Sequence, residues 1–359
     1  MTWLSEVDIS AVHVRIPLLR PFVTATGTWR DHDAWLVRLR STDGRVGIGE
    51  ATLGPGASAA ELTELGSLIR ALAADPAAAA DVVEGPVGAA VGAARLDGGW
   101  PVMWSPNGDV RPSVAVNGTI AVESTEASVN AARELVAAGF GTLKLKVGSE
   151  ASTAQLVMRV RLIRETVGPT VRLRLDANGC WGGVVARDRL DALARFELEY
   201  VEQPLAVGPP EEMARLRADV SVPIAADESV SGIVAATRLL EAGSADVLIV
   251  KPARVGAPGA CLVVAERATA TGVGVVISTL LETGVGIGAA LALAARLPRS
   301  RWAYAHGLAT AGLLASDLLT EPLAISAGRM SLPAVPGVAG RIDFEAVRRH
   351  AIEWVGEPW

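Results

Sequence analysis

From residue 112 onward, short apolar runs alternate with longer stretches of helical periodicity, in which apolar residues recur every three or four positions. The apolar runs predict strands at Ser113–Val116, Thr142–Lys146, Val171–Asp176, Tyr200–Glu202, Ile224–Asp227, Val247–Lys251, Val273–Ser278 and Trp302–His306. The stretches between them predict helices at Ser124–Ala138, Ser152–Thr166, Ala186–Phe196, Glu211–Ala218, Ile233–Glu241, Gly259–Thr271 and Gly284–Ala295. This alternation predicts an α/β fold with a closed βα barrel rather than an open sheet.

The first part of the chain has a different pattern. Val7–Ile16 and Ala34–Leu39 alternate like strands, and Asp43-Gly44 is typical of a hairpin turn that leads into a third strand. Glu61–Ala74 then shows helical periodicity. Strands followed by a helix predict a small α+β domain ahead of the barrel.

These patterns divide the chain into three predicted parts. The α+β domain is expected at residues 1–111 and the barrel at residues 112–325, while residues 326–359 are expected to leave the barrel and pack back onto the first domain. Half of the 359 residues are hydrophobic, which is enough for a core of this size.

Composition and charge argue against several classes of protein. The net charge is −6 and no basic stripe is visible, so binding to nucleic acid or to an anionic membrane is not expected. The uncharged runs are too short to span a bilayer and no secretory signal is visible, so we expect a cytoplasmic protein. Cys180 and Cys261 are expected to be free thiols, and the four histidines lack zinc-ligand spacing.

Five ionisable side chains stand at the ends of successive apolar runs, one per run. They are Lys146, Asp176, Glu202, Asp227 and Lys251, at intervals of 30, 26, 25 and 24 residues. These intervals approximate one strand-plus-helix unit, so each residue is predicted at the carboxyl end of a successive parallel strand. In a βα barrel those ends meet at one mouth, where active sites lie.

Three carboxylates in one small volume would repel one another unless a cation joins them. Ligation by oxygen alone suits a hard cation, so Asp176, Glu202 and Asp227 predict a Mg²⁺ site, with Mn²⁺ as the alternative. Asn178 and Glu228 flank two of these ligands and are expected to orient them. The alternative interpretation is that the acidic residues cap the following helices or pair with arginines.

One further lysine, Lys144, belongs to the same pattern. Lys144 and Lys146 are two positions apart on one strand and therefore point to the same face. Lys251 lies four strands from Lys146, so the two are predicted to face each other across the barrel, with a carboxylate substrate between them. A lysine that only extends its ammonium to solvent is the alternative for Lys251.

These residues stand in motifs that resemble those of the enolase superfamily, in its muconate-lactonizing-type subgroup. The motifs are Lys144-x-Lys146, Asp176-Ala-Asn178, Glu202-Gln-Pro, Asp227-Glu-Ser and Lys251-Pro-Ala-Arg254-Val-Gly. The resemblance implies a modified TIM barrel, (β/α)7β, with an α+β capping domain. It also implies Mg²⁺ and a lysine base, because sites of this superfamily combine a Lys or His base with Mg²⁺.

Within the superfamily, the segments SVAVNGTIA, ISTLLETGVGIGAALALAARLP and AHGLATAGLLASDLL resemble those of o-succinylbenzoate synthases. This resemblance implies a lyase that dehydrates 2-succinyl-6-hydroxy-2,4-cyclohexadiene-1-carboxylate to o-succinylbenzoate, a step toward menaquinone, through α-proton abstraction and an enediolate. Two alternatives stay open. One is an N-succinylamino acid racemase, or a protein with both activities, and the other is a barrel that binds metal and ligand without turnover.

The resemblance also implies individual roles. Lys146 would be the base, Lys251 would stabilise the anion, Lys144 would contact the substrate carboxylate, and Arg254 would support the metal ligands. Substrate contacts are predicted from Asn117, Ser278, Thr279, Gly284, Thr26 and Leu53. The amides of Gly284–Gly286, near a helix N-terminus, are expected to hold a second carboxylate. The expected partner is a small-molecule carboxylate, and the oligomeric state stays open, a homo-oligomer included.

Overall fold

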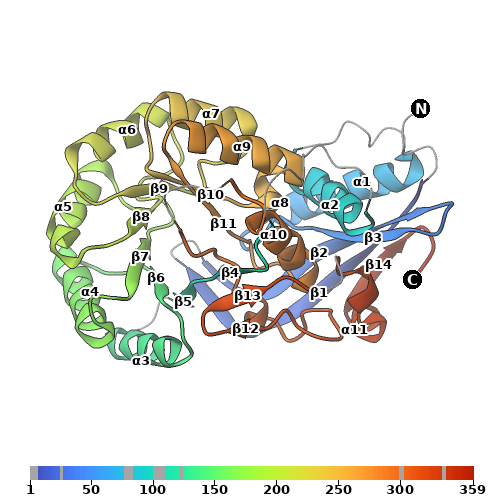
Figure 1. The fold of residues 1–359 in the computed structure, drawn as a ribbon, viewed down its shortest axis with the longest axis horizontal. Coiled ribbons are helices and arrows are strands. Elements are labelled where there is room, and N and C mark those ends of the chain that lie inside the picture. The colour runs from blue at the N-terminus through green and yellow to red at the C-terminus, as the bar shows by residue number, and fades with distance from the viewer. Residues whose placement is uncertain are drawn as a thin grey trace.

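The structure, a computed structural model, describes residues 7–24, 27–76, 84–99, 110–121, 124–298, 303–333 and 337–359. Figure 1 shows a curled parallel sheet with helices around its outer side, next to an antiparallel sheet that carries α1 and α2 on one face. Within the described ranges, no helix combines the length and the apolar character that crossing a bilayer would require.

The parallel sheet runs in the order β11-β10-β9-β8-β7-β6-β5, so each strand pairs with the next one along the chain. Its strands are β5 (Gly118–Ile120), β6 (Thr142–Lys146), β7 (Arg172–Asp176), β8 (Tyr200–Glu202), β9 (Ile224–Ala226), β10 (Val247–Val250) and β11 (Gly274–Ile277). The helices between and after them are α3 (Thr125–Ala137), α4 (Thr153–Val167), α5 (Gly183–Leu193), α6 (Pro210–Asp219), α7 (Ile233–Glu241), α8 (Pro252–Val255), α9 (Pro258–Ala270) and α10 (Gly284–Ala294). Helices and strands share one continuous hydrophobic core, which fixes the strand ends relative to one another.

Helix starts follow from short polar side chains. Ser124 and Ser152 precede α3 and α4, and each side chain accepts a hydrogen bond from an amide of the first turn. Ser58 and Glu61 form a reciprocal capping box at the start of α1 (Ala59–Ala74). For α3 and α4, the observed helix begins within one residue of the start that the sequence pattern predicts.

The curled sheet is closed by residues 303–307, which lie between its two edges. His306 forms a parallel bridge with Val116, and Gly307 forms one with Ser278. The closing segment therefore links the β4–β5 region to the end of β11, as the last strand of a barrel does.

Two predicted strands differ from the structure. Ser113–Val116 was expected to begin the barrel, but β4 (Ser113–Ala115) pairs antiparallel with β13 (Arg329–Ser331), and the first parallel strand is β5. The predicted strand Trp302–His306 is not a regular strand in the described residues, where only His306 forms an isolated bridge. Trp302 lies outside the described residues. An apolar run looks the same in sequence whether its neighbour is parallel or antiparallel, so periodicity could not separate these cases.

The antiparallel sheet, with α1 and α2, forms the part called here the cap. Its strand order is β14-β1-β2-β3, with β1 (Val7–Thr24), β2 (Gly27–Ser41), β3 (Val46–Ala51) and β14 (Ala351–Val355). The predicted Asp43-Gly44 turn joins β2 to β3, and Gly44 has the positive φ of 88° that suits glycine there. The helix α2 (Gly85–Asp97) was not predicted.

Both faces of the cap sheet are buried. One face packs on α1 and α2, and the other packs on barrel segments around Leu281 and Leu314. Hydrophobic burial therefore holds the cap over the mouth of the barrel. The C-terminal part returns to the cap through α11 (Phe344–His350) and β14, which pairs antiparallel with β1. The limits 1–111, 112–325 and 326–359 stay predictions.

Candidate active site

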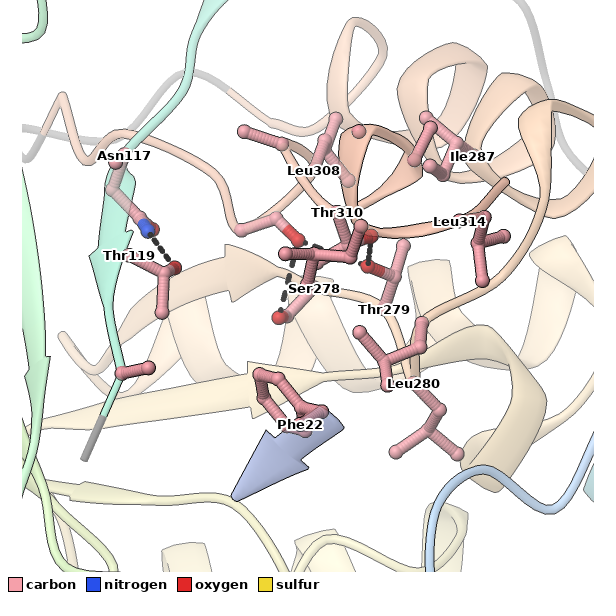
Figure 2. Close-up of a pocket in the computed structure, with 18 of the residues that line it drawn as sticks. Phe22, Asn117, Thr119, Ser278, Thr279, Leu280, Ile287, Leu308, Thr310 and Leu314 are labelled. Atoms are coloured by element: carbon pink, nitrogen blue, oxygen red, sulfur yellow. Dashed lines mark hydrogen bonds between the residues drawn. The ribbon is translucent and has the colours of Figure 1, made fainter. Parts of the chain in front are cut away.

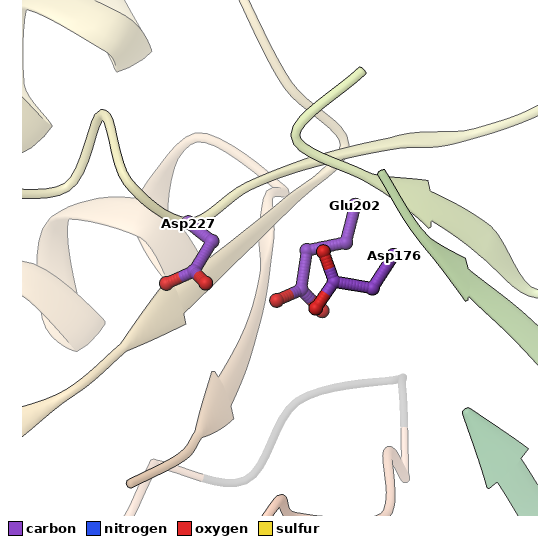
Figure 3. Close-up of side chains that lie close together, drawn as sticks. All are labelled: Asp176, Glu202 and Asp227. Carbon is purple, nitrogen blue, oxygen red and sulfur yellow. The ribbon is translucent and has the colours of Figure 1, made fainter. Parts of the chain in front are cut away.

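The three predicted metal ligands come together at the carboxyl ends of neighbouring strands. Asp176 ends β7, Glu202 ends β8, and Asp227 follows β9. Parallel register places Asp176 beside Glu202. All three side chains are buried, and one carboxylate oxygen from each lies within 4.8 Å of the others. Figure 3 shows the carboxylates directed toward one volume, an arrangement of oxygens that could hold a hard divalent cation.

Lysine ammonium groups approach this acidic group from two sides. Lys146 Nζ lies 2.6 Å from Asp176 Oδ2, and Lys251 Nζ lies 2.6 Å from Asp227 Oδ2. Lys146 ends β6 and Lys251 directly follows β10, while the acidic residues come from β7, β8 and the end of β9 between them. The order of strands in the sheet therefore places the acidic group between the two amines.

Burial and mutual repulsion disturb the ionisation of these side chains. Burial, reinforced by the Asp176 charge, raises the pKa of Glu202 to about 8, although Lys144 Nζ lies 2.7 Å from Glu202 Oε1. Burial also opposes ionisation of Asp176, but Lys144 and Lys146 hold the pKa of Asp176 well below its ordinary value. Burial disfavours the charged form of Lys144, yet the carboxylates outweigh it and raise the pKa of Lys144. Burial and the neighbouring acidic charge therefore disfavour ionisation of Glu202 even with lysines in contact with the acidic group.

Asn178, Glu228 and Arg254 lie around the acidic group. The Asn178 side chain accepts a hydrogen bond from Lys146 Nζ over 3.0 Å and donates one to Glu228 Oε1 over 3.0 Å. Arg254 Nη1 donates to Asp227 Oδ1 over 2.9 Å and to the Asp227 carbonyl over 3.0 Å. These contacts restrict the rotamers of a lysine and of a proposed ligand, which is how neighbouring residues orient a metal site.

A cavity of about 970 Å³ lies between the barrel mouth and the cap. Four predicted substrate contacts are on its wall: Asn117, Ser278, Thr279 and Gly284. Figure 2 shows Phe22 of β1 at the same cavity, so the cap contributes to the wall. Leu53 is not among the described residues that line the cavity, and Thr26 lies outside the described residues.

The amides at the start of α10 have hydrogen-bond partners within the protein, and the expectation that they hold a second substrate carboxylate stays a prediction. The Gly284 amide donates to the Asp317 carbonyl over 2.9 Å. The Gly286 amide donates to Glu50 Oε2 over 3.0 Å, and the Thr283 amide lies 3.1 Å from both Glu50 oxygens. A carboxylate from the cap already occupies this helix N-terminus, which a pattern within the barrel sequence could not reveal.

Sequence reasoning also missed two buried side chains next to the site. Arg174 on β7 is fully buried and donates to the Asn117 side chain over 3.3 Å. Gln203 has a positive φ of 39° and accepts a hydrogen bond from the Asp227 amide over 2.9 Å. The available signal for Arg174 was its place on the same strand face as a predicted ligand, Asp176, two positions on.

Comparisons with known proteins agree with this geometry. The chain matches the family model described as enolase C-terminal domain-like over residues 127–347. A relative from Thermobifida fusca, named o-succinylbenzoate synthase, is 42% identical over 226 residues, which cover 63% of this chain and 66% of the relative. A relative of the same name from Mycolicibacterium smegmatis is 39% identical over 248 residues, which cover 68% of this chain and 74% of the relative.

A solved structure resembles nearly the whole chain. Muconate lactonizing enzyme from Pseudomonas fluorescens, complexed with muconolactone, has a TM-score of 0.86 at 26% identity and covers 97% of this chain and 99% of that one. The predicted modified TIM barrel with an α+β capping domain is thereby confirmed. Because the family model spans more than half of the chain, the protein belongs to the enolase superfamily and is an enzyme of that superfamily.

Proposed function

We propose that the protein is a Mg²⁺-dependent lyase of the cytoplasm that converts 2-succinyl-6-hydroxy-2,4-cyclohexadiene-1-carboxylate to o-succinylbenzoate, a step toward menaquinone. The relatives named o-succinylbenzoate synthase support this choice of substrate. The observation that carries the proposal is the pair of amines, Lys146 and Lys251, on either side of a buried acidic group, each 2.6 Å from a carboxylate oxygen.

The residues present fit a divalent cation. Three buried carboxylates share one volume, and burial with the Asp176 charge raises the pKa of Glu202 to about 8, so full ionisation of the group would be favoured by a bound cation. Asp176, Glu202 and Asp227 would hold Mg²⁺, with Mn²⁺ as the alternative. When bound, such an ion supplies Lewis-acid stabilisation of negative charge on a carboxylate.

Lys146 serves as the base in this proposal. Its amine takes the proton from the ring carbon that carries the carboxylate, and it then gives that proton to the hydroxyl group on the neighbouring ring carbon, which leaves as water. One C–H bond and one C–O bond break, a C=C bond forms, and the ring becomes aromatic. The change is the loss of one water, so no oxidant or reductant is needed.

The remaining charged groups stabilise and orient. Lys251, on the far side of the acidic group, stabilises the transient anion electrostatically. Lys144 contacts Asp176 and Glu202 at 2.9 and 2.7 Å, which places its ammonium where a substrate carboxylate is expected. Phe22, together with Pro55, covers the cavity from the cap side and limits access of water to the anion.

The test is a spectroscopic assay with the purified protein, Mg²⁺ and the cyclohexadiene substrate. Conversion of the conjugated cyclohexadiene to the aromatic product changes the ultraviolet absorption spectrum, and we expect this change only when a divalent cation is present. Lys146→Arg is the matched variant, because arginine keeps the charge but does not give up its proton. We expect it to lose the activity. A wild-type protein that produces no aromatic absorbance with Mg²⁺ would contradict the proposal.

N-succinylamino acid racemisation is the second candidate, as a replacement or an additional activity. It is favoured by the same pair of amines, because racemisation needs one group to remove a proton and another to return it from the opposite face. In deuterium oxide, a racemase would exchange the α-hydrogen of an N-succinylamino acid, and nuclear magnetic resonance would detect the loss. If no exchange occurs while the aromatic product forms, the racemase candidate is excluded.

A further inference from the structure

A carboxylate of the cap is buried at the N-terminus of the barrel helix α10, apart from the acidic group. Glu50 Oε2 accepts hydrogen bonds from the Thr283 hydroxyl over 2.6 Å and from the Gly286 amide over 3.0 Å. Its Oε1 atom lies 3.0 Å from His32 Nε2, and the Thr283 amide is 3.1 Å from both oxygens. The Glu50 side chain is 0% exposed, so the helix amides and His32 replace water as its partners.

The residues just before α10 form part of the cavity wall. Ser278, Thr279, Leu280 and Leu281 all line the cavity, and Figure 2 shows Ser278 and Thr279 beside Thr310. The Thr279 hydroxyl lies 3.0 Å from Thr310 Oγ1 and donates to the Gly307 carbonyl over 3.1 Å. Only Glu282 separates this wall from Thr283, the residue that Glu50 contacts. A displacement at the start of α10 therefore moves the wall.

The contact between Glu50 and the helix leaves no free space. A Cβ atom at Gly286 would stand 2.6 Å from Glu282 Cβ, which is too close, and 3.1 Å from Glu50 Oε2, which is tight, so this position favours glycine. The cap touches the same wall a second time, because a Cβ at Gly54 would stand 2.8 Å from the Leu280 side chain. Two cap contacts, four residues apart in the chain, thus locate one short wall segment.

We propose that Glu50 is a positioning residue: through Thr283 and Gly286 it locates the wall segment 278–283, and this segment sets how tightly the cavity binds the part of the substrate beyond the acidic group. Glu50 is not among the described residues that line the cavity, so it acts through the wall and touches no reacting atom. Loss of the contact between Glu50 and α10 should therefore raise KM more than it lowers kcat. The inference rests on the proposed function for the identity of the substrate, but not for the movement of the wall.

The test compares Glu50→Gln with Asp97→Asn as a matched control. Asp97 is a partly buried carboxylate that, like Glu50, accepts backbone hydrogen bonds: from Ile48 over 2.8 Å, from Ala339 over 3.1 Å and from Val338. It joins β3 and α2 to the C-terminal segment, and it is not among the described residues that line the cavity. Both variants remove a carboxylate charge that links separate segments of the chain. Only Glu50→Gln removes a charge that contacts the wall segment 278–283.

Hydrogen–deuterium exchange of peptides that cover residues 278–288 provides a readout that does not depend on turnover. We expect Glu50→Gln to speed exchange there by about tenfold, while Asp97→Asn leaves these amides near the wild-type rate when each protein is measured at the same interval below its own melting temperature. In the assay of the proposed reaction, Glu50→Gln should raise KM by about tenfold and change kcat by less than about threefold. Asp97→Asn should lower the melting temperature without this change in KM.

The milder variant Thr283→Val keeps the proposal testable if Glu50→Gln does not fold. It removes the 2.6 Å hydrogen bond to Glu50 and should shift exchange and KM in the same direction by a smaller factor. Wild-type-like exchange at residues 278–288 in a folded Glu50→Gln or Thr283→Val protein would overturn the positioning role. Equal KM changes in Glu50→Gln and Asp97→Asn would overturn it too. If the wild type does not act on the cyclohexadiene substrate, the proposed function fails, and the exchange result still decides the role of Glu50.

Discussion

Cation binding at the acidic group should be coupled to loss of a proton from Glu202. In the protein without a cation, burial and the Asp176 charge raise the pKa of Glu202 to about 8, so its carboxyl group carries a proton at neutral pH. A divalent cation needs the ionised carboxylate as a ligand and must therefore displace this proton. The perturbation is a change of pH during a titration with Mg²⁺ or Mn²⁺.

The size of the effect follows from the position of this pKa. At pH 6 about 1% of Glu202 would be ionised, against about half at pH 8. The association constant should therefore rise by about 50-fold from pH 6 to pH 8, or ~2.3 kcal/mol at 1.36 kcal/mol per pKa unit. At pH 7 each bound cation should release about 0.9 proton.

Isothermal titration calorimetry in buffers of different ionisation enthalpy measures both quantities. The variant Glu202→Gln is the control, because it lacks the titrating group and should bind weakly, with little dependence on pH over this range. An association constant that stays constant from pH 6 to pH 8 in the wild type would refute the reasoning. Glu202 would then be ionised before the cation arrives, and the repulsion between buried carboxylates would be too small to matter.

Three further substitutions test separate parts of the account. Lys146→Ala should lower turnover by about 10²–10⁴-fold with an unchanged circular dichroism spectrum, and near-normal turnover would rule out Lys146 as the base. Asp176→Asn should weaken Mg²⁺ binding by at least about tenfold, and equal calorimetric affinity would remove Asp176 from the ligands. Burial, reinforced by the Glu50 charge, raises the pKa of Glu282 to about 7, so folding loses about 3 kcal/mol from this group as pH rises from 4.5 through 7. Glu282→Gln should remove that loss in denaturant unfolding at pH 5 and pH 8, and an identical pH dependence in both proteins would contradict the cause given.

The meeting of the acidic residues could be predicted because it follows from local rules. Asp176, Glu202 and Asp227 each stand where an apolar run ends, and parallel strands of similar spacing bring such ends to one mouth. The resemblance to the enolase superfamily is confirmed by the family match and by the barrel with its cap. The roles of the individual lysines and of the substrate-contacting residues stay predictions.

Contacts between distant segments could not be predicted in the same way. Glu50 reaches Thr283 across 233 positions, and Arg174 reaches Asn117 across 57, and neither pair has a periodic signal in the sequence. Ser113–Ala115 pairs antiparallel with Arg329–Ser331, and this pairing depends on how the C-terminal segment packs against the rest of the chain. Tertiary placement decided these features, because local pattern constrains only which face of an element is apolar.

The central claim is that three carboxylates hold one divalent cation between two amines. A crystal structure with Mn²⁺, located by its anomalous scattering, tests it most directly. The account predicts a single anomalous peak within about 2.5 Å of oxygens from Asp176, Glu202 and Asp227, with Lys146 and Lys251 on opposite sides of it. Three carboxylates that share no peak at a saturating Mn²⁺ concentration would contradict the account.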